Sequence, residues 1–391
     1  MRTDPLARLR AATDARGVAG LRRTLRPRRQ DNDGLLDLAS NDYLGLARDE
    51  RLIAAAVRAA REWGTGSTGS RLVTGHTALH ATLEERLGAF CDAEAALVFS
   101  SGFLANLAAV AAPARVLAGD GGVLVVSDEG NHASLIDACR LSRARVKVTP
   151  HKAVDAVDKV LRDRDERHAM VVTDAVFSVE GDLAPVAELS AVAARHGALL
   201  VVDEAHALGV VGELGQGAVH AAGLAGNAHI MRTVTLSKSL GSQGGAVLAA
   251  REVIETLIDT GRSFIFDTGL APSSAAAAAA AVDIIAADPG LPARARANAH
   301  SLAGAARALG LETGEPSAAV VPVVLGSPHT ALNAAAVCRD HGVHAGCFRP
   351  PSVPEGRSCL RLTARADLGS DDLAVIGGAL GAVSELKVHR E

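Results

Sequence analysis

The hydrophobic residues of this chain gather in short runs that alternate with longer stretches of helical spacing. Seven of these runs lie at positions 95–99, 123–126, 146–148, 170–173, 199–202, 232–236 and 246–248. Short apolar runs without polar alternation are typical of strands buried on both faces, and helical crossovers between them make the strands parallel. The pattern therefore predicts an α/β protein with a mostly parallel seven-stranded sheet between layers of helices.

The same pattern divides the chain into three segments. Leucines at positions 6, 9, 21 and 25 recur at helical spacing before Pro27, which predicts a helical N-terminal arm within residues 1–45. A large domain is expected over residues 46–287, and it ends in a helix with seven consecutive alanines. A smaller α+β domain is expected over residues 288–391, with strands at 319–325 and 359–363 and helices at 330–340 and 371–386.

Composition and charge exclude several classes of protein. The 391 residues carry a net charge of -4, and the isoelectric point is near 6.4, so there is no basic surplus to follow a nucleic-acid backbone. The five cysteines are scattered and form no C-x-x-C pair, which favours reduced, mostly buried thiols over a disulfide framework. The N-terminus shows no signal peptide, and no stretch reaches about 18 apolar residues. We expect a cytoplasmic protein that acts on small molecules.

Polar residues follow four of the predicted strands at the point where each strand ends. They form the segments 100–103, 174–178, 203–206 and 237–238. Ligands of open α/β sheets bind at the carboxyl ends of the strands. These four segments are therefore expected to converge on one site.

Lys238 follows the apolar run 232–236 and stands between Ser237 and Ser239, just before a glycine-rich turn. In a partly desolvated pocket a lysine loses part of its preference for the ammonium form and can condense with an aldehyde to a Schiff base. Pyridoxal 5'-phosphate requires such a lysine. Ser-Lys-Ser alone also suits an ordinary surface lysine, so the interpretation depends on the other strand ends.

Asp203 and His206 belong to the sequence Asp-Glu-Ala-His, which also occurs in ATPases and helicases. That function needs a G-x-x-x-x-G-K-[ST] loop for the phosphates, and the chain contains no Gly-Lys pair. Instead, an aspartate at the end of a buried strand can hold the protonated pyridine nitrogen of pyridoxal phosphate. His206 would then lie near the ring oxygen. His132 also follows a strand, where it either lies flat against the ring or has only a structural role.

Three further segments bear on binding. Residues 100–106 begin a helix whose free N–H groups suit a phosphate, although an ordinary N-cap serine explains this segment equally well. The proline-rich loop 348–356 holds Arg349 on a stiff backbone, where its guanidinium can grip a carboxylate. His76 and His80 stand four residues apart but lack the glutamate of an H-E-x-x-H motif, so no metal site is predicted.

Together these residues resemble the α-oxoamine synthases, fold-type I pyridoxal-phosphate enzymes that join an amino acid to an acyl-CoA with loss of CO2. The resemblance covers nearly the whole chain, from about Leu21 to Leu386. The motifs that carry it are LASNDYLGL (38–46), SGF (101–103), HASL (132–135), VFS (176–178), DEAH (203–206), TLSK (235–238) and RPPSVP (349–354). Ala207 stands where relatives usually have glycine, and Ser352 stands where they have threonine. Neither change removes a chemical role.

The resemblance implies a role for each candidate residue. Lys238 would form the Schiff base, Asp203 would pair with the pyridine nitrogen, and His206 would lie beside the ring oxygen. His132 would stack on the ring and face the substrate. The remaining groups are Gly102, Phe103, Ser178 and Thr235 on the phosphate side, Arg349 for the amino-acid carboxylate, and Arg22 and Ser352 for the acyl substrate.

The resemblance also implies L-alanine and a pimeloyl thioester as substrates, in the branch of the family that serves biotin biosynthesis. Arg22 favours this donor because it could pair with the distal carboxylate of a dicarboxylic acyl chain. The carrier would be CoA or acyl-carrier protein, and a homodimer with active sites at the subunit interface is expected. The alternatives are glycine with a short acyl donor, giving 2-amino-3-oxobutyrate or 5-aminolevulinate, and a catalytically silent protein that kept the fold.

Overall fold

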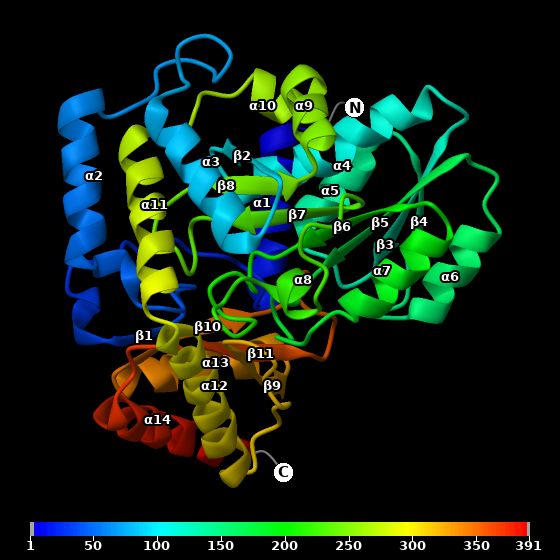
Figure 1. Ribbon diagram of the computed structural model, residues 1–391. Helices are drawn as coiled ribbons and strands as arrows, with labels where there is room; N and C mark the ends of the chain where they lie inside the picture. Colours follow the sequence, from blue (N-terminus) through cyan, green and yellow to red (C-terminus); the bar gives the residue numbers. More distant parts are fainter. Residues whose placement is uncertain (1–3, 389–391) are drawn as a thin grey trace. The chain divides into compact units, whose positions relative to one another are not determined.

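The computed structural model describes residues 4–388 and groups the chain into two compact units (Figure 1). Unit 1 comprises Met1–Ser40, Val179–Gly181 and Arg296–Glu391, and unit 2 comprises Asn41–Ser178 and Asp182–Ala295. The N-terminal segment thus belongs to the same unit as the C-terminal part of the chain. No local sequence pattern indicates this grouping.

Seven strands form the sheet of unit 2. They are β2 (Ala95–Phe99), β3 (Val123–Asp128), β4 (Arg145–Thr149), β5 (His168–Asp174), β6 (Leu199–Asp203), β7 (Ile230–Thr235) and β8 (Gly245–Ala249), in the order β2-β8-β7-β6-β5-β3-β4. The pairs from β7 to β4 are all parallel, which confirms the predicted sheet. β8 runs antiparallel to β2 and β7, because the connection 236–244 is too short for a helical crossover.

Most of the strands are buried on both faces, as their continuous apolar runs predicted. The prediction is wrong for β4, which lies at the edge of the sheet and has Arg145, Lys147 and Val148 exposed. Every residue of β3, β7 and β8 is buried. The helices of unit 2 are α2 (Glu50–Trp63), α3 (Ala78–Cys91), α4 (Gly102–Ala118), α5 (Ala133–Ser142), α6 (Val154–Arg162), α7 (Val186–Arg195), α8 (Ala218–Ala221), α9 (Arg251–Thr260), α10 (Arg262–Ile265) and α11 (Pro272–Ala287), with a 3-10 turn at Leu46–Arg48. The alanine-rich α11 lies beside α2 and α3 (Figure 1), because small side chains let helices approach closely.

Unit 1 contains a four-stranded sheet in the order β1-β10-β11-β9. Its elements are β1 (Leu36–Leu38), β9 (Val320–Gly326), α13 (Pro328–Asp340), β10 (Val343–Phe348), β11 (Ser358–Thr363), α14 (Ser370–Val388), a 3-10 turn at Asn32–Gly34 and the later part of α12 (Gly290–Ala308). β1 is parallel to β10, and the other pairs are antiparallel. The predicted strands and helices of this part are found. β10 was not predicted, because its alternating residues are only weakly apolar.

The N-terminal arm departs from the prediction. α1 (Pro5–Val18) ends well before Pro27, and residues 21–29 have no regular secondary structure. Gly20 ends the helix with a φ of +66°, a conformation that suits glycine. Leu25 is 99% exposed, so the leucine spacing does not mark a buried helix face. The predicted helix is therefore wrong over the second half of the arm.

The cysteine thiols are reduced and mostly buried. All five cysteines are free, four of them buried and Cys347 half-buried, as the sequence predicted. Between residues 4 and 388 no single helix is long and apolar enough to cross a membrane. α11 and α12 reach that length only together, and they are bent by 84° at the break between them.

Candidate active site at the strand ends of unit 2

The carboxyl ends of β5, β6 and β7 bring buried polar residues together. In the parallel ladder Asp174 lies opposite Asp203, and Asp203 lies opposite Thr233. All three residues are buried. Because parallel strands in this register end at the same edge of the sheet, their terminal side chains share one site.

Lys238 lies in a bend three residues after β7 and is half-buried. Its Nζ is 2.7 Å from Nε2 of His206, and Nδ1 of the same ring is 2.5 Å from Oη of Tyr43. Tyr43 is fully buried and His206 nearly so. The three side chains form one hydrogen-bonded chain that ends at the lysine amine.

Asp203 is held on both of its oxygens. Oδ1 accepts the backbone N–H of Ala205 at 2.9 Å, and Oδ2 accepts the side-chain amide of Asn106 at 2.6 Å. The Asn106 amide also donates to Ser134 at 2.8 Å, and its oxygen accepts the Thr233 hydroxyl at 2.5 Å. These contacts fix the direction of the Asn106 amide and, through it, the orientation of the carboxylate. We refer to Tyr43, Asn106, Asp203, His206 and Lys238 as the strand-end cluster.

Asp174 places a second carboxyl group beside Asp203. Its side chain accepts the backbone N–H of His132 at 2.9 Å. Burial, and next the negative charge of Asp203, raise the pKa of Asp174 well above its usual value. Two buried neighbouring carboxylates do not both ionise readily, which agrees with the raised pKa of Asp174.

His132 caps the start of α5. Its Nδ1 accepts the backbone N–H of Ser134 at 3.3 Å and lies 2.7 Å from the Ser134 hydroxyl. Partial burial of the ring lowers the pKa of His132, the Asp203 carboxylate opposes this shift, and the Lys238 amine adds to it. The rest of the side chain is exposed. Because the residue is exposed, its ring can contact a ligand.

The first turn of α4 lies close to the end of β7. The N-cap Ser101 accepts the N–H of Leu104 at 3.2 Å, and the N–H groups of Gly102 and Phe103 precede the first intrahelical bonds. A Cβ at Gly102 would come within 3.2 Å of the Thr235 Cβ, so the glycine allows this close approach. Free N–H groups, a hydroxyl and the positive end of the helix dipole together suit a phosphate.

Other predicted positions lie around this cluster. Ser178 is half-buried and lies four residues beyond β5. The Phe103 ring is 43% exposed, and Ala207 is fully buried. Phe103 therefore contributes little to the core, although it follows a glycine that does pack closely.

Glu204, between Asp203 and His206 in the sequence, serves the backbone. Its buried carboxylate accepts the N–H groups of Ala218 and Val219, at 2.8 and 2.9 Å, at the start of α8. Burial raises the pKa of Glu204 to about 7. A carboxylate that accepts two backbone N–H groups has a structural role. This role agrees with the rejection of the ATPase interpretation.

The predicted substrate residues Arg22, Arg349 and Ser352 all belong to unit 1. Arg349 donates to the carbonyl of Gly20, and its buried Nε has no hydrogen-bond partner among residues 4–388. Arg22 and Arg349 line one pocket. Ser352 is exposed and accepts a hydrogen bond from Arg23 at 3.2 Å. The structure therefore places Ser352 beside Arg23, the neighbour of Arg22.

The His76 and His80 pair is explained by local contacts. His80 is fully buried, its Nδ1 accepts the N–H of Thr77 at 3.1 Å, and its Nε2 lies 2.8 Å from the Leu270 carbonyl. Burial lowers the pKa of His80 to about 4. His76 lies 2.8 Å from the Arg71 guanidinium. Among the described residues, no group of three or more His, Cys, Asp or Glu side chains is arranged to hold a metal ion.

Sequence reasoning gave no role to Tyr43 or Asn106. Asn106 lies four residues after Gly102 in α4. Residues at that spacing share one helix face, so the sequence indicates that Asn106 faces the same side as Gly102. Tyr43 precedes its partner His206 by 163 residues. No local pattern connects such distant positions.

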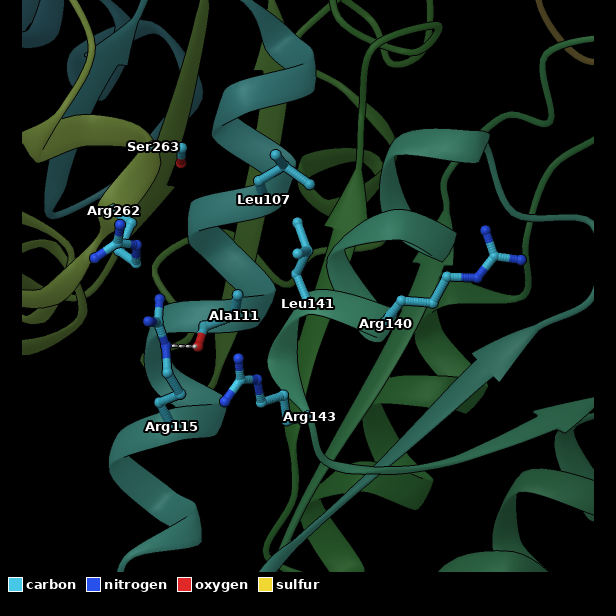
Figure 2. A pocket seen from close by; sticks show the side chains of 8 residues that line it. All are labelled: Leu107, Ala111, Arg115, Arg140, Leu141, Arg143, Arg262 and Ser263. Carbon is cyan, nitrogen blue, oxygen red and sulfur yellow. Dashed lines mark hydrogen bonds between the residues drawn. The ribbon is translucent and has the colours of Figure 1, made fainter. Parts of the chain in front are cut away.

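A separate groove of about 530 Å³ lies between α4, α5 and α10 (Figure 2). It is lined by four arginines and by apolar side chains: Arg115, Arg140, Arg143 and Arg262, with Leu107, Ala111 and Leu141. Arg140 pairs with Asp137 at 3.0 Å. None of these residues was predicted to have a function. We call this hollow the α4 groove.

Comparisons with known proteins agree with this geometry. Residues 33–380 match the family model described as aminotransferase class I and II. An 8-amino-7-oxononanoate synthase from Mycolicibacterium smegmatis is 56% identical over 371 residues, which cover 95% of this chain and 94% of the relative. A protein of the same name from Mycobacterium tuberculosis is 56% identical over 369 residues, which cover 94% of this chain and 93% of the relative.

Solved structures also share the fold of this chain. A serine palmitoyltransferase from S. paucimobilis with a bound PLP-myriocin aldimine has a TM-score of 0.90 and 28% identity, and the match covers 98% of this chain and 99% of that chain. An 8-amino-7-oxononanoate synthase from Francisella tularensis has a TM-score of 0.76 and 24% identity, over 92% of this chain and 100% of that chain. The second likeness concerns the fold alone.

Proposed function

Because the chain belongs to the aminotransferase class I and II family, and within it to the 8-amino-7-oxononanoate synthases, we propose that it condenses L-alanine with a pimeloyl thioester. The products would be 8-amino-7-oxononanoate, CO2 and the free carrier, in biotin biosynthesis. The observation that supports this activity most directly is the chain from Tyr43 through His206 to Lys238 beside the buried Asp203.

The strand-end cluster fits pyridoxal 5'-phosphate. Lys238 offers an amine for the aldehyde, Asp203 offers a carboxylate for the ring nitrogen, and the N–H groups at the start of α4, beside Thr235, offer donors for the phosphate. When bound, this cofactor supplies an aldehyde that condenses with amines and a protonated ring that takes up the charge left by proton removal or decarboxylation.

Lys238 needs an uncharged amine to act as a nucleophile or a base. If the ammonium donates to Nε2 of His206, Nδ1 carries the other proton and donates to Tyr43. If Tyr43 donates to Nδ1 instead, Nε2 carries a proton and the amine accepts it. Both arrangements satisfy the contacts of 2.7 and 2.5 Å, but only the first leaves the Tyr43 hydroxyl free to donate to Oδ1 of Asn41 at 3.2 Å. His206 can therefore stabilise Lys238 in either protonation state.

Asp203 would keep the ring nitrogen protonated. Its oxygens are already oriented by Ala205 and Asn106, so little reorganisation is needed when charge develops on the ring. The raised pKa of Asp174 makes a second negative charge next to Asp203 less favourable. His132, which is exposed, would cover the cofactor and contact the substrate.

Arg349 would hold the amino-acid carboxylate. One guanidinium nitrogen is used by the Gly20 carbonyl, whereas the buried Nε has no partner among residues 4–388. An unsatisfied buried donor is costly, and a carboxylate oxygen would satisfy it. Arg22 and Ser352 remain the proposed partners of the acyl chain.

The substrate assignment is tested by measuring release of the free thiol with each combination of donor and acceptor. The acceptors are alanine, glycine and serine, and the donors are pimeloyl, acetyl, succinyl and palmitoyl thioesters. We expect alanine with a pimeloyl donor to give the highest kcat/KM. A clear preference for glycine with acetyl or succinyl donors would contradict the assignment and leave the pyridoxal chemistry intact.

The role of Lys238 is tested by Lys238→Ala. The variant should lose both the visible absorbance of the lysine-bound cofactor and the activity, since no other amine lies at this position. Lys159→Ala, at an exposed position of α6, is the matched control and should retain both. A wild-type protein that binds no cofactor would favour a catalytically silent protein instead.

We also propose that the enzyme is a homodimer with active sites at the subunit interface. Large apolar side chains of unit 2 are exposed in the single chain, among them Leu72, Val73, Phe103 and Phe266. Several exposed apolar residues of this size are typical of an interaction surface. Light scattering on the purified protein should give twice the chain mass, and a monomer at assay concentration would contradict the proposal.

A further inference from the structure

A histidine outside the strand-end cluster is held between two carboxylates in unit 2. His151 lies just after β4, with its Nδ1 3.1 Å from Oδ1 of Asp128 and its Nε2 3.0 Å from Oδ2 of Asp182. Lys152 also pairs with Oδ2 of Asp182. The group therefore contains two positive and two negative side chains when His151 is protonated. We call these four residues the His151 bridge.

The geometry of the bridge requires a proton on both nitrogens of the ring. A neutral imidazole has one N–H, so it would donate to one carboxylate and turn a lone pair toward the other. Asp128 is already an acceptor, because its two oxygens accept the backbone N–H groups of Gly130 and Lys152, both at 2.7 Å. Oδ1 of Asp182 is buried and has no hydrogen-bond partner among residues 4–388. The Asp182 carboxylate is therefore stabilised through the oxygen that His151 and Lys152 share.

The ring of His151 also packs tightly against two neighbouring segments. Its centroid lies 4.2 Å from that of the Phe177 ring, and the two rings are nearly perpendicular, at 79°. A Cβ at Gly130 would come within 2.8 Å of Nδ1 of His151 and within 3.1 Å of the Phe177 ring. Any residue larger than glycine would displace one of these rings, so the contact depends on the exact position of His151.

Both segments lead directly to proposed cofactor residues. Gly130 lies two residues before His132, and Phe177 lies directly before Ser178. The backbone N–H of Phe177 also donates to the carbonyl of Asp182 at 3.0 Å, so Asp182 is tied to the second segment by its backbone as well as through the bridge. The bridge therefore connects the segment that carries His132 to the segment that carries Ser178.

We propose that His151 is a positioning residue for the cofactor site. As an imidazolium held by two carboxylates, it fixes the segments that carry His132 and Ser178 and thereby the contacts of these two residues with the cofactor. This inference rests on the proposed function, which assigns His132 to the cofactor ring and Ser178 to the phosphate side. His151 itself does not need to touch the cofactor or the substrate.

This positioning should depend on pH. Partial burial by itself lowers the pKa of His151, but the hydrogen bonds to Asp128 and Asp182 outweigh it and raise the pKa. Both contacts are therefore complete below the ordinary histidine value of about 6.5 and are lost as the pH rises through the raised value. The charged groups around the residue are these two carboxylates, Lys152 and Glu129, which accepts the backbone N–H of His151 at 3.0 Å.

The main test begins with the protein free of cofactor. In His151→Gln, which cannot carry the charge, backbone hydrogen exchange should become faster than in wild type over residues 128–134 and 175–178. The dissociation constant of pyridoxal 5'-phosphate should rise about tenfold, and it should increase less with pH than in wild type. His196→Gln is the matched control, because it removes a histidine that lies 3.0 Å from the Asp158 carboxylate elsewhere in unit 2. It should leave exchange in both segments and cofactor affinity unchanged.

Asp182→Asn tests the same contact from the other side. It should also weaken cofactor binding, and the double variant with His151→Gln should be impaired by less than the product of the two single effects. Effects that simply multiply would overturn the inference. Wild-type exchange and cofactor affinity in His151→Gln would overturn it too, as would a variant that only unfolds at a lower temperature.

NMR of the wild-type ring provides a measurement that does not depend on folding of the variants. At about pH 6, both nitrogens of His151 should carry protons, and a ring with a single proton at this pH would overturn the inference.

Turnover separates this inference from the proposed function. If exchange and cofactor affinity change as described but wild-type protein condenses no acyl donor with alanine, His151 keeps its positioning role and the proposed reaction fails. If wild type is active with alanine and a pimeloyl thioester, and His151→Gln binds the cofactor as tightly as wild type, the reaction stands and the inference fails.

Discussion

The strand-end cluster of unit 2 keeps its charged side chains within hydrogen-bond distance of partners. In unit 1, by contrast, a pocket of about 370 Å³ lined by Arg22, Arg26, Arg28, Arg339 and Arg349, here called the arginine pocket, contains several arginines that form no ion pair among residues 4–388. In the cluster, Lys238 and Asp203 each have a neighbour at 2.7 Å or less. In the pocket, Arg26 and Arg339 have no ion pair within the described chain. Asp203 is buried, while Arg26 is exposed.

This difference indicates that the two regions have different roles. A buried, fully hydrogen-bonded group is already oriented and stabilises charge that develops during a reaction. Unpaired cations at an exposed pocket attract an anionic ligand, and salt screens that attraction. Activity should therefore be sensitive to the replacement of single atoms in the cluster. Ligand binding at the pocket should depend on the net charge of its side chains.

The largest effect is expected from Asp203→Asn. An amide cannot keep the ring nitrogen of the cofactor protonated, so the rate should fall on the order of a thousandfold or more, equivalent to roughly 4 kcal/mol. Cofactor retention should change far less. Exchange of the alanine α-proton with solvent measures the step directly. Asp155→Asn, at an exposed position of α6, is the control, and unchanged exchange in Asp203→Asn would rule out the role.

Asn106→Ala should lower kcat by about tenfold, because it leaves the Asp203 oxygen and the Thr233 hydroxyl without the partner between them. The isosteric Asn106→Asp separates orientation from packing. It keeps the shape of the side chain but replaces the donor that faces Asp203 with a second acceptor. Both variants should also move the pH dependence of the cofactor absorbance. If Asn106→Asp kept the wild-type kcat, Asn106 would have only a packing role.

The strand ends were predictable because sheet geometry is encoded locally. A buried apolar run followed by polar residues marks a carboxyl end, and parallel register then aligns Asp174 with Asp203. The partners of those residues were harder to predict. Tyr43 lies far away in sequence, and the β8 reversal depends on the length of one connection.

The arginine pocket could be predicted only in part. Arg22 was assigned to the acyl substrate, but the arm was expected to be helical, and a helix would not direct alternate residues to one side. Arg339 joins the pocket from α13, more than three hundred residues later. Sequence patterns report which residues are charged. They do not report which distant charges meet.

Salt concentration should affect the two regions differently. Raising the salt concentration from about 0.05 M to about 0.5 M should raise KM for pimeloyl-CoA several-fold, because exposed charges are screened over a few ångströms at high ionic strength. KM for alanine and kcat should change little. The Arg26→Gln/Arg339→Gln variant should show a weaker salt dependence of KM than wild type. Equal salt dependence in both proteins would contradict an electrostatic role for the pocket.

The smallest effect concerns the pKa of His344, measured by NMR titration of the ring. Arg339→Gln should raise this pKa, because the largest charge that lowers it is removed, and Asp37→Asn should lower it further. His344 has a lower pKa in the folded protein than in the unfolded chain. Protonation therefore costs stability as the pH falls below the usual histidine value of about 6.5. Arg339→Gln should lose less stability on this acidification than wild type. An unchanged His344 pKa in both variants would show that the guanidinium charges do not converge at this ring.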